Sequence, residues 1–206
     1  LDLTHVWAGP LATRSLADLG ADVLKVESGY ARGPAVLPTT TGLFPNNDAG
    51  EEPWNRNGFL NKLNRNKKGI SINLKEPRGR DLLLKLVAEC DVFITNQPYS
   101  VREKLGVTYE ELSPLNPKMI YASLTAYGEA GDERARKGFD QLAYWARSGL
   151  MDLMREPGGV PQQGLSGMGD HPTGVALYAG IVTALMRREQ TGEGGLVHTS
   201  LLANGI

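Results

Sequence analysis

Short apolar runs of the kind that form buried strands alternate with amphipathic helical patterns along most of this chain. Parallel strands need a long crossover connection, and a helix usually supplies it, so this alternation favours a parallel sheet. The crossover helices then cover both faces of the sheet. We therefore expect an α/β fold, with strands at residues 3–7, 23–27, 69–74, 91–96, 119–124 and 195–200 and helices at 11–19, 77–88, 101–105, 139–151 and 172–188.

The carboxyl ends of the expected strands are where a ligand should bind. In open parallel sheets, ligands lie outside these ends, among the loops that leave the strands. One longer connection, residues 28–57, shows little periodicity and is expected to be a surface loop or flap. The segments that follow strands directly are 7–10, 73–75, 96–98 and 125–128, and we expect functional residues among them.

Charge and composition narrow the classes of function. The chain of 206 residues has 22 Lys and Arg against 23 Asp and Glu, a net charge of −1, which excludes a globally basic nucleic-acid binder. Residues 175–186 form the longest apolar stretch, too short to span a bilayer, and no signal peptide is recognisable. With Cys90 as its single cysteine, the chain is typical of a cytoplasmic protein. The sequence begins within an apparent strand and ends within an apparent helix, so we expect this chain to be a segment of a longer protein.

Several common site motifs are absent from the sequence. Neither GxGxxG nor GxxxxGK[ST] follows a strand, and no GxSxG elbow is present. One cysteine and three histidines that are far apart in sequence do not make a zinc site, so no metal is expected. A basic run at residues 56–68 favours a solvated loop, with an anion-binding surface as the alternative.

Asp170 stands just before a helical pattern, within a glycine-rich segment at residues 164–174. Aspartate at such a position commonly caps the helix by accepting backbone N–H bonds, and residue type alone favours this interpretation. At this position the Asp170 carboxylate would also be held on a rigid helix start, beside small residues that let a substrate approach. A carboxylate placed in this way can act as a nucleophile. The residues themselves leave both interpretations open.

A series of short segments, none decisive alone, is specific in its order and spacing. It is similar to the family III (CaiB/BaiF) CoA-transferases, the group that includes formyl-CoA transferase, over almost the whole chain. The resemblance implies a Rossmann-like parallel sheet with helices on both faces. The segments are VWAGP at 6–10, LGADVLKVE at 19–27, NRNKKGI at 64–70, DVFITN at 91–96, NPKMIY at 116–121, GFD at 138–140, GD at 169–170 and REQTGEG at 188–194.

This resemblance implies a reaction and an organisation of the protein. Asp170 matches the family's nucleophile, which attacks an acyl-CoA thioester and then carries CoA to an acceptor acid. The resemblance also implies that residues 1–206 are the N-terminal part of a large CoA-binding domain. A small domain and a C-terminal return would lie outside the chain, and the whole protein would be an interlocked homodimer. Acyl-CoA and a small carboxylic acid are the implied substrates.

The resemblance also implies contacts with coenzyme A, carried over by position. Three departures, Trp7 for Gln, Ser28 for Arg, and Pro98-Tyr99 for Arg-Pro, favour an acyl group bulkier or less acidic than formyl or oxalyl. The implied contact residues are Trp7 and Ala8, then Ile72, Asn73, Leu74 and Lys75, then Asn96, Gln97 and Pro98, then Lys104, and finally Lys137, Gly138, Phe139 and Asp140.

Two alternatives to CoA transfer remain to be weighed. α-Methylacyl-CoA racemases resemble this family, but their catalytic histidine falls at Phe139, whose side chain cannot move a proton. His171, next to Asp170, could be proposed instead, although a residue in the first turn of a helix needs no such role. The other alternative is a CoA-binding segment without turnover of its own.

Overall fold

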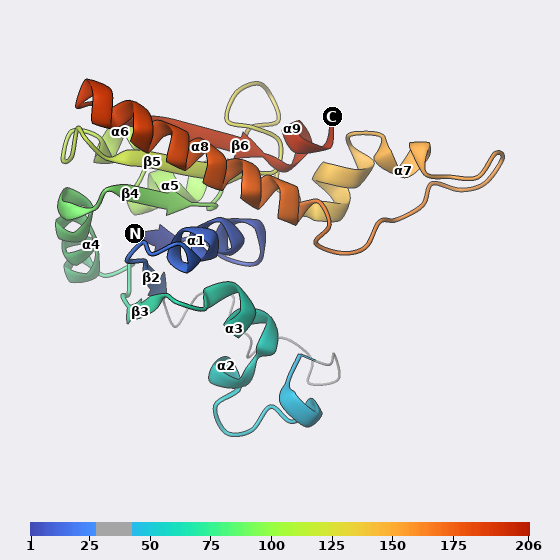
Figure 1. Cartoon of the computed structure of the whole chain (residues 1–206), viewed down its shortest axis with the longest axis horizontal. Helices are drawn as coiled ribbons and strands as arrows, with labels where there is room; N and C mark the ends of the chain where they lie inside the picture. Colours follow the sequence, from blue (N-terminus) through green and yellow to red (C-terminus); the bar gives the residue numbers. More distant parts are fainter. Residues whose placement is uncertain (28–42) are drawn as a thin grey trace.

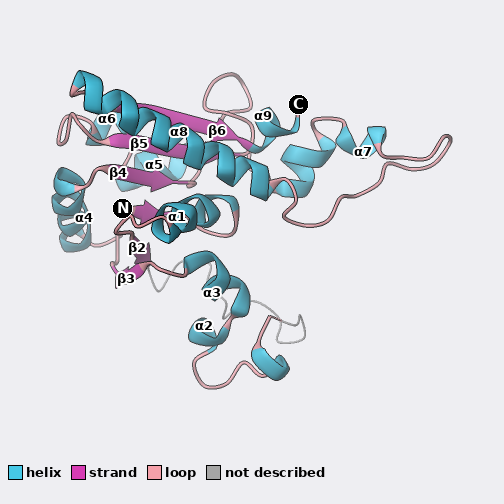
Figure 2. Cartoon of the chain, in the orientation of Figure 1, coloured by secondary structure: helices cyan, strands magenta, loops and turns pink. Residues whose placement is uncertain are grey.

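A computed structural model of the chain describes residues 1–27 and 43–206. Six strands form a single sheet in which every neighbouring pair is parallel, in the order β3-β2-β1-β4-β5-β6 (Figures 1 and 2). The expected α/β fold is therefore confirmed. The strands are β1 (Asp2–Leu3), β2 (Leu24–Glu27), β3 (Lys68–Ser71), β4 (Val92–Thr95), β5 (Ile120–Thr125) and β6 (Gly195–Ser200).

Helices cover both faces of the sheet because successive strand residues point to opposite sides. Phe93 and Tyr121 pack on one face with α4 (Pro77–Glu89), α5 (Tyr99–Leu105) and α6 (Tyr109–Leu112). Their neighbours Ile94 and Ala122 pack on the other face with α1 (Ala8–Asp18) and α8 (Asp170–Thr191). Figure 1 shows α1 and α8 lying side by side over this second face.

The strand order places a switch point between β1 and β4. From β1 the chain builds outward through β2 to β3, and it then returns to β4 on the other side of β1. The loops after β1 and β4 therefore leave the sheet in opposite directions and open a crevice between them. A ligand site is therefore expected at the carboxyl ends of these two strands.

Four expected elements differ from the structure. The strand expected at 69–74 ends at Ser71. The strand expected at 3–7 ends at Leu3, since Val6 has a φ of 70° and turns the chain into α1. The helix expected at 139–151 is divided at Gly149, with a φ of 89°, into a π-helical turn, η4 (Gln141–Ala146), and α7 (Leu150–Leu153). Within the expected loop 28–57, residues 28–42 lie outside the described part, and the rest contains a short turn, η3 (Pro45–Asn47), and α2 (Pro53–Arg56).

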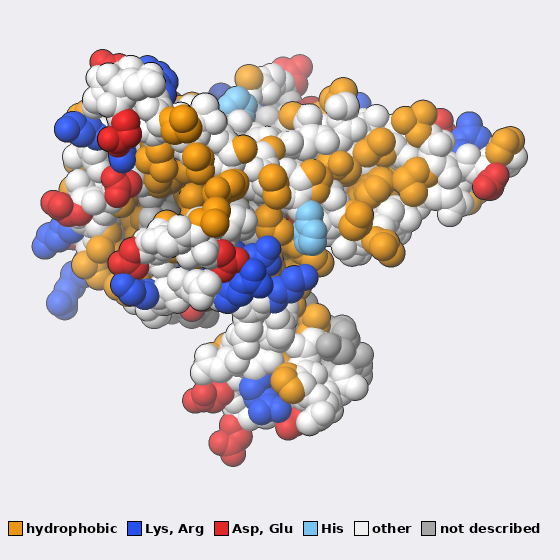
Figure 3. Space-filling model, in the orientation of Figure 1, with side chains coloured by type: hydrophobic (Ala, Val, Ile, Leu, Met, Phe, Trp, Pro, Cys, Tyr) orange, Lys and Arg blue, Asp and Glu red, His pale blue; other side chains and the backbone are white. Residues whose placement is uncertain are grey.

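The basic run at 56–68 is largely neutralised by the protein itself. Most of it lies on α3 (Gly58–Asn64) and the turn after it, where Figure 3 shows Lys and Arg side chains gathered at the junction with the main body. Arg65 pairs with Asp18 at 2.6 Å, and Lys68 pairs with Asp22 at 2.9 Å. Arg56 and Lys67 also have carboxylate partners, Asp48 and Asp2. These ion pairs favour a structural role for the basic run over an anion-binding surface.

A buried ion cluster fixes the amino end of the sheet. The carboxylate of Asp2, which is fully buried, accepts hydrogen bonds from the Thr4 and Thr13 hydroxyls at 2.6 and 2.7 Å. Lys67 lies 3.1 Å from one Asp2 oxygen, and Lys25 lies 3.5 Å from the other. Burial opposes ionisation of Asp2, but the two ammonium groups and the hydroxyls hold its pKa well below the usual range.

An arm and a terminal helix complete the described structure. Residues after η4 extend away from the body as an arm that includes α7 and returns to the start of α8 (Figure 1). The arm exposes apolar side chains, among them Leu153, Val160 and Leu165. After β6, the chain ends in α9 (Leu201–Gly205). No helix within residues 1–27 and 43–206 is long and apolar enough to cross a membrane.

Candidate functional site

A cavity of about 520 Å³ opens at the switch point of the sheet. Loops that follow β1, β3, β4 and β5 all contribute to its wall, as expected for a ligand site of this fold. Its charged lining is mostly cationic. The lining residues are Leu3, His5, Val6, Trp7, Ala8, Val26, Glu27, Asn73, Leu74, Lys75, Asn96, Gln97, Pro98, Val101, Leu105, Leu124, Thr125, Ala126, Arg134, Arg136, Lys137, Gly138, Phe139, Asp170 and Leu201.

Most of the residues expected to contact coenzyme A lie together on this cavity. Three do not line it: Ile72 is buried in the core, Lys104 is exposed on α5, and Asp140 is buried beneath the loop before α8. The expected residues that do line it are Trp7, Ala8, Asn73, Leu74, Lys75, Asn96, Gln97, Pro98, Lys137, Gly138, Phe139 and Asp170.

Other lining residues were not predicted from the sequence. Arg134 and Arg136 come from the loop between β5 and η4, and His5 comes from the turn after β1. The sequence could have predicted the two arginines as site residues, because three basic residues occur within positions 134–137, shortly after a strand end. Burial lowers the pKa of His5 to about 4, with Lys25 as the second cause, so the imidazole is neutral at pH 7.

The turn after β1 is held in a strained conformation at the cavity wall. Val6 has a φ of 70°, which a β-branched residue rarely adopts, and such outliers cluster at functional sites. The side chain of Asn96 secures this turn by accepting a hydrogen bond from the His5 N–H at 2.8 Å and donating one to the His5 carbonyl at 2.7 Å. Asn96 therefore joins the two loops at the switch point.

Asp140 clamps the loop that leads to Asp170. One of its oxygens accepts a hydrogen bond from the Gly167 N–H at 2.7 Å, and the other accepts one from the Gly169 N–H at 2.9 Å. Gly167 has a φ of 83°, and a Cβ there would lie 2.6 Å from the Trp7 ring, so only glycine lets the loop lie this close. These hydrogen bonds give Asp140 a positioning role, and its predicted contact with coenzyme A stays a prediction.

Asp170 is the first residue of α8 and faces the cavity. Gly169, and not Asp170, occupies the N-cap position of α8. Among the described residues, no side chain accepts a capping hydrogen bond at the start of this helix, so the structure does not support the capping interpretation of Asp170. Burial raises the pKa of Asp170 to about 7, and the negative charge of Asp140 adds to the shift.

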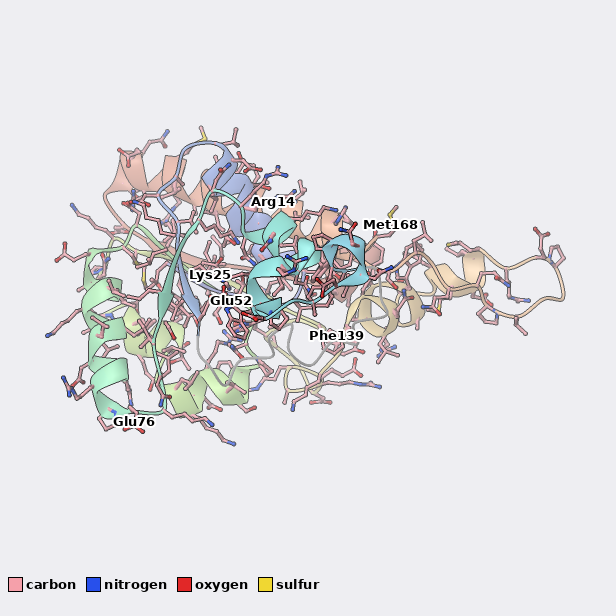
Figure 4. The ribbon with its side chains drawn as sticks, turned by 90° about the horizontal axis from the view of Figure 1, so that it is seen from below. Arg14, Lys25, Glu52, Glu76, Phe139 and Met168 are labelled. Carbon is pink, nitrogen blue, oxygen red and sulfur yellow. The ribbon has the colours of Figure 1, made fainter. Side chains whose placement is uncertain are left out.

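Aromatic side chains surround the approach to Asp170. Trp7 contacts Phe59 edge-on, with ring centroids 4.8 Å apart, and its ring lies 5.6 Å from that of His171. Phe139 is 55% exposed and lies on the same cavity. Figure 4 shows Phe139 and Met168 at the root of the arm, on the two segments that meet there. This end of the cavity is therefore suited to an apolar group.

The arrangement combines two chemically different surfaces in one cavity. Lys75, Arg134, Arg136 and Lys137 suit an anionic ligand, and Asp170 supplies a partly buried carboxylate beside an aromatic wall. Within the described ranges, no group of three or more His, Cys, Asp or Glu side chains is placed to hold a metal ion. The fold and cavity define an α/β domain with a ligand cavity at the switch point of its parallel sheet, and Asp170 presents a carboxyl group of raised pKa there.

Comparison with known proteins identifies the family. The model of CoA-transferase family III matches residues 1–206, and the chain belongs to this family. It is 36% identical over 206 residues to (R)-2-hydroxy-4-methylpentanoate CoA-transferase from Clostridioides difficile, covering 100% of this chain and 50% of that protein. It is 38% identical over 212 residues to succinyl-CoA:glutarate CoA-transferase from Mus musculus, covering 100% of this chain and 45% of that protein.

A solved structure supports the same assignment. A CaiB/BaiF family protein from Brucella suis superposes with a TM-score of 0.84 at 33% identity, covering 98% of this chain and 52% of that one. The expected Rossmann-like sheet and the expected family are thus confirmed. The chain spans about half the length of the relatives that it matches.

Proposed function

We propose that the full-length protein transfers CoA from an acyl-CoA to a carboxylic acid, with Asp170 as the nucleophile. The observation that carries this proposal is the position of Asp170, a carboxyl group of raised pKa on the same cavity as most of the implied CoA contacts. The cationic lining suits the phosphates of coenzyme A, and burial favours attack by excluding water from a reactive intermediate.

The proposed reaction exchanges acyl groups without net proton transfer. A carboxylate oxygen of Asp170 attacks the thioester carbon, the C–S bond breaks, and a mixed anhydride and CoA thiolate form. The thiolate then attacks the aspartyl carbonyl carbon, which releases the donor acid and leaves an aspartyl-CoA thioester. An acceptor carboxylate attacks that thioester and runs the two steps in reverse, so acyl-CoA of the acceptor leaves and Asp170 is regenerated.

Phe139 argues against the racemase alternative. It lines the cavity in the position where the resemblance implies a proton-transferring histidine, and its ring has no titratable group. His171 contacts Trp7 rather than lining the cavity, and burial lowers its pKa. Neither residue supplies the second base that exchange of an α-proton requires.

The acyl group is proposed to be larger than formyl. Trp7, with Phe59 against it, places an aromatic wall near Asp170, and apolar acyl groups gain free energy by covering such a surface. Two relatives have names that refer to five- and six-carbon acids, namely glutarate and 2-hydroxy-4-methylpentanoate. We expect donors and acceptors of similar size for this protein.

The remaining assignments concern the whole protein. We propose that residues 1–206 are the N-terminal part of the large CoA-binding domain, and that the small domain and the C-terminal return are supplied by further sequence. Apolar side chains on the arm, including Leu153 and Leu165, fit burial in an interlocked homodimer. We also propose a cytoplasmic location, for which the single cysteine, Cys90, is typical. The isolated segment would then bind CoA without catalysing its transfer.

A screen of acyl-CoA donors against carboxylate acceptors, using the full-length protein, tests the proposed function. Transfer of CoA between two acids is the expected result. The same incubations in deuterated water separate the racemase, because a transferase leaves the α-hydrogen of the acyl group in place. Incorporation of deuterium at turnover rates, without CoA transfer, would contradict the assignment.

The pH dependence of the reaction should report Asp170. Protonated Asp170 cannot attack a thioester, so kcat/KM is expected to rise about tenfold per pH unit below pH 7 and to level off above it, following a pKa of about 7. Initial rates over pH 5–9 in the full-length protein measure this profile. A profile that stays nearly flat down to pH 5, as the ordinary aspartate value of 3.8 predicts, would show that the site leaves Asp170 unperturbed.

Asp140→Asn provides a second arm of this experiment. Removing its negative charge takes away one cause of the raised pKa, so the midpoint should move to lower pH. The maximal rate should also fall, since an amide cannot accept both loop N–H bonds. Asp22→Asn, an exposed position that pairs with Lys68, is the matched control and should leave the midpoint unchanged.

A further inference from the structure

We infer that Arg134, held in place by Tyr99, binds a phosphate group of coenzyme A in the cavity that Asp170 also lines. The inference rests on the proposed function and names residues that neither the sequence resemblance nor the family comparison assigns. Arg134 lines the cavity and is exposed, so its guanidinium is accessible to a ligand.

Arg134 differs from the other arginine of the cavity in its electrostatic partners. The guanidinium of Arg136 is paired with Glu133, which also pairs with Arg147 at 3.1 Å. Within the part of the chain that the structure describes, no carboxylate forms an ion pair with Arg134. Its charge is therefore available to an anion from outside, and Arg is the side chain best shaped for a phosphate, with five N–H donors in one plane.

Tyr99 positions this guanidinium through a cation–π contact. The guanidinium carbon of Arg134 lies 5.0 Å from the centroid of the Tyr99 ring. Such a contact orders the side chain without a hydrogen-bond acceptor of the protein, so the N–H donors stay available to a ligand. Tyr99 is the first residue of α5, whose Val101 and Leu105 also line the cavity, so the ring holds Arg134 on the cavity wall.

Arg102 anchors the whole arrangement to the core. It is 1% exposed, lies over the same Tyr99 ring at 5.1 Å, and donates a hydrogen bond to Glu129 at 2.6 Å. Glu129 belongs to the loop that carries Arg134, and Gly128 and Gly131 turn that loop with φ values of 105° and 78°. This ion pair, partly buried, thus fixes the loop beside Tyr99, and the cation–π contact holds Arg134 on the same ring.

The test measures binding of coenzyme A to the full-length protein by isothermal titration calorimetry. Arg134→Ala should weaken binding by about ten- to a hundredfold, the range for loss of hydrogen bonds to a charged group. The dependence of Kd on KCl should become shallower in this variant, because one screened charge contact is lost. Arg187→Ala, which removes the same charge from the far end of α8, should bind as the wild type does.

Tyr99 is tested as a positioning residue. Tyr99→Leu should weaken binding by roughly two- to fivefold through loss of the cation–π contact, and Tyr99→Phe, which keeps the ring, should restore it. Dephospho-CoA identifies the phosphate concerned. An effect of Arg134→Ala on coenzyme A alone assigns the 3′-phosphate, and an equal effect on both ligands assigns the diphosphate.

Two results would overturn the inference. One is an Arg134→Ala variant that binds coenzyme A within twofold of the Arg187→Ala control. The other is weakened binding with an unchanged KCl dependence and a lowered urea midpoint, which would show a structural role for Arg134. Failure of the proposed function is distinguishable from both, because it would appear in the donor–acceptor screen with the wild-type protein, whereas these two results are read from binding of coenzyme A.

Discussion

Replacing Asp170 by asparagine in the full-length protein is expected to lower kcat for CoA transfer by about 10⁴-fold or more, the scale seen when a nucleophile is removed. Asparagine has the shape of aspartate but cannot form the anhydride. Binding of coenzyme A should change little, because the substitution leaves the cationic lining that suits its phosphates unchanged. Initial rates and calorimetric titration measure the two quantities.

Asp152→Asn is the control for this variant. Asp152 lies on α7, where its exposed carboxylate pairs with Arg155, so its replacement should leave the rate within twofold of the wild type. Retention of a tenth or more of the activity by Asp170→Asn would contradict nucleophilic attack by this side chain. Equal losses in the two variants would point to the arm rather than the carboxylate.

Replacing Asp2 by alanine is expected to lower the free energy of unfolding by about 3–5 kcal/mol. Asp2 is fully buried, and its removal leaves Lys25 and Lys67 without their shared counter-ion. Burial already lowers the pKa of Lys67 to about 8 in the presence of Asp2, although Asp2 raises it, so without Asp2 this pKa should fall further. Urea unfolding of the full-length protein gives the change in free energy.

Asp22→Ala separates burial from simple loss of an ion pair. The Lys68–Asp22 pair is on the surface, with both side chains more than two-thirds exposed at 72% and 75%, so its loss should cost less than about 1 kcal/mol. The pKa of Asp2 is lowered in the folded state, so the stability it contributes is present at neutral pH and is lost as the pH falls below about 4. A loss as small as that of Asp22→Ala would contradict the account of the cluster.

The sheet could be predicted from the sequence because its strands are short apolar runs with turn signals between them. β4 and β5 were placed within one or two residues, since their alternating side chains pack on two different cores. The helical pattern at 139–151 was misleading, because an apolar periodicity does not show the break at Gly149. α6 was missed although Thr108 and Glu111 form a capping box, which a search for that pattern would have found.

The candidate site was predictable where it follows from strand ends. Trp7, Asn73 and Gln97 come directly after strands, and parallel topology brings those ends together. The clamp between Asp140 and the loop before α8 was not predictable, because it joins residues 27 and 29 positions apart through side-chain geometry. The raised pKa of Asp170 likewise depends on burial by segments that are distant in sequence.

Chemical trapping of the intermediate tests the central claim, that Asp170 carries CoA between the two acids. The full-length protein is incubated with a donor acyl-CoA in the absence of acceptor, treated with hydroxylamine, digested and mapped by mass spectrometry. The account predicts a hydroxamate on Asp170 that is absent from the Asp170→Asn variant. A hydroxamate on another residue, or CoA transfer without any modification of Asp170, would contradict it.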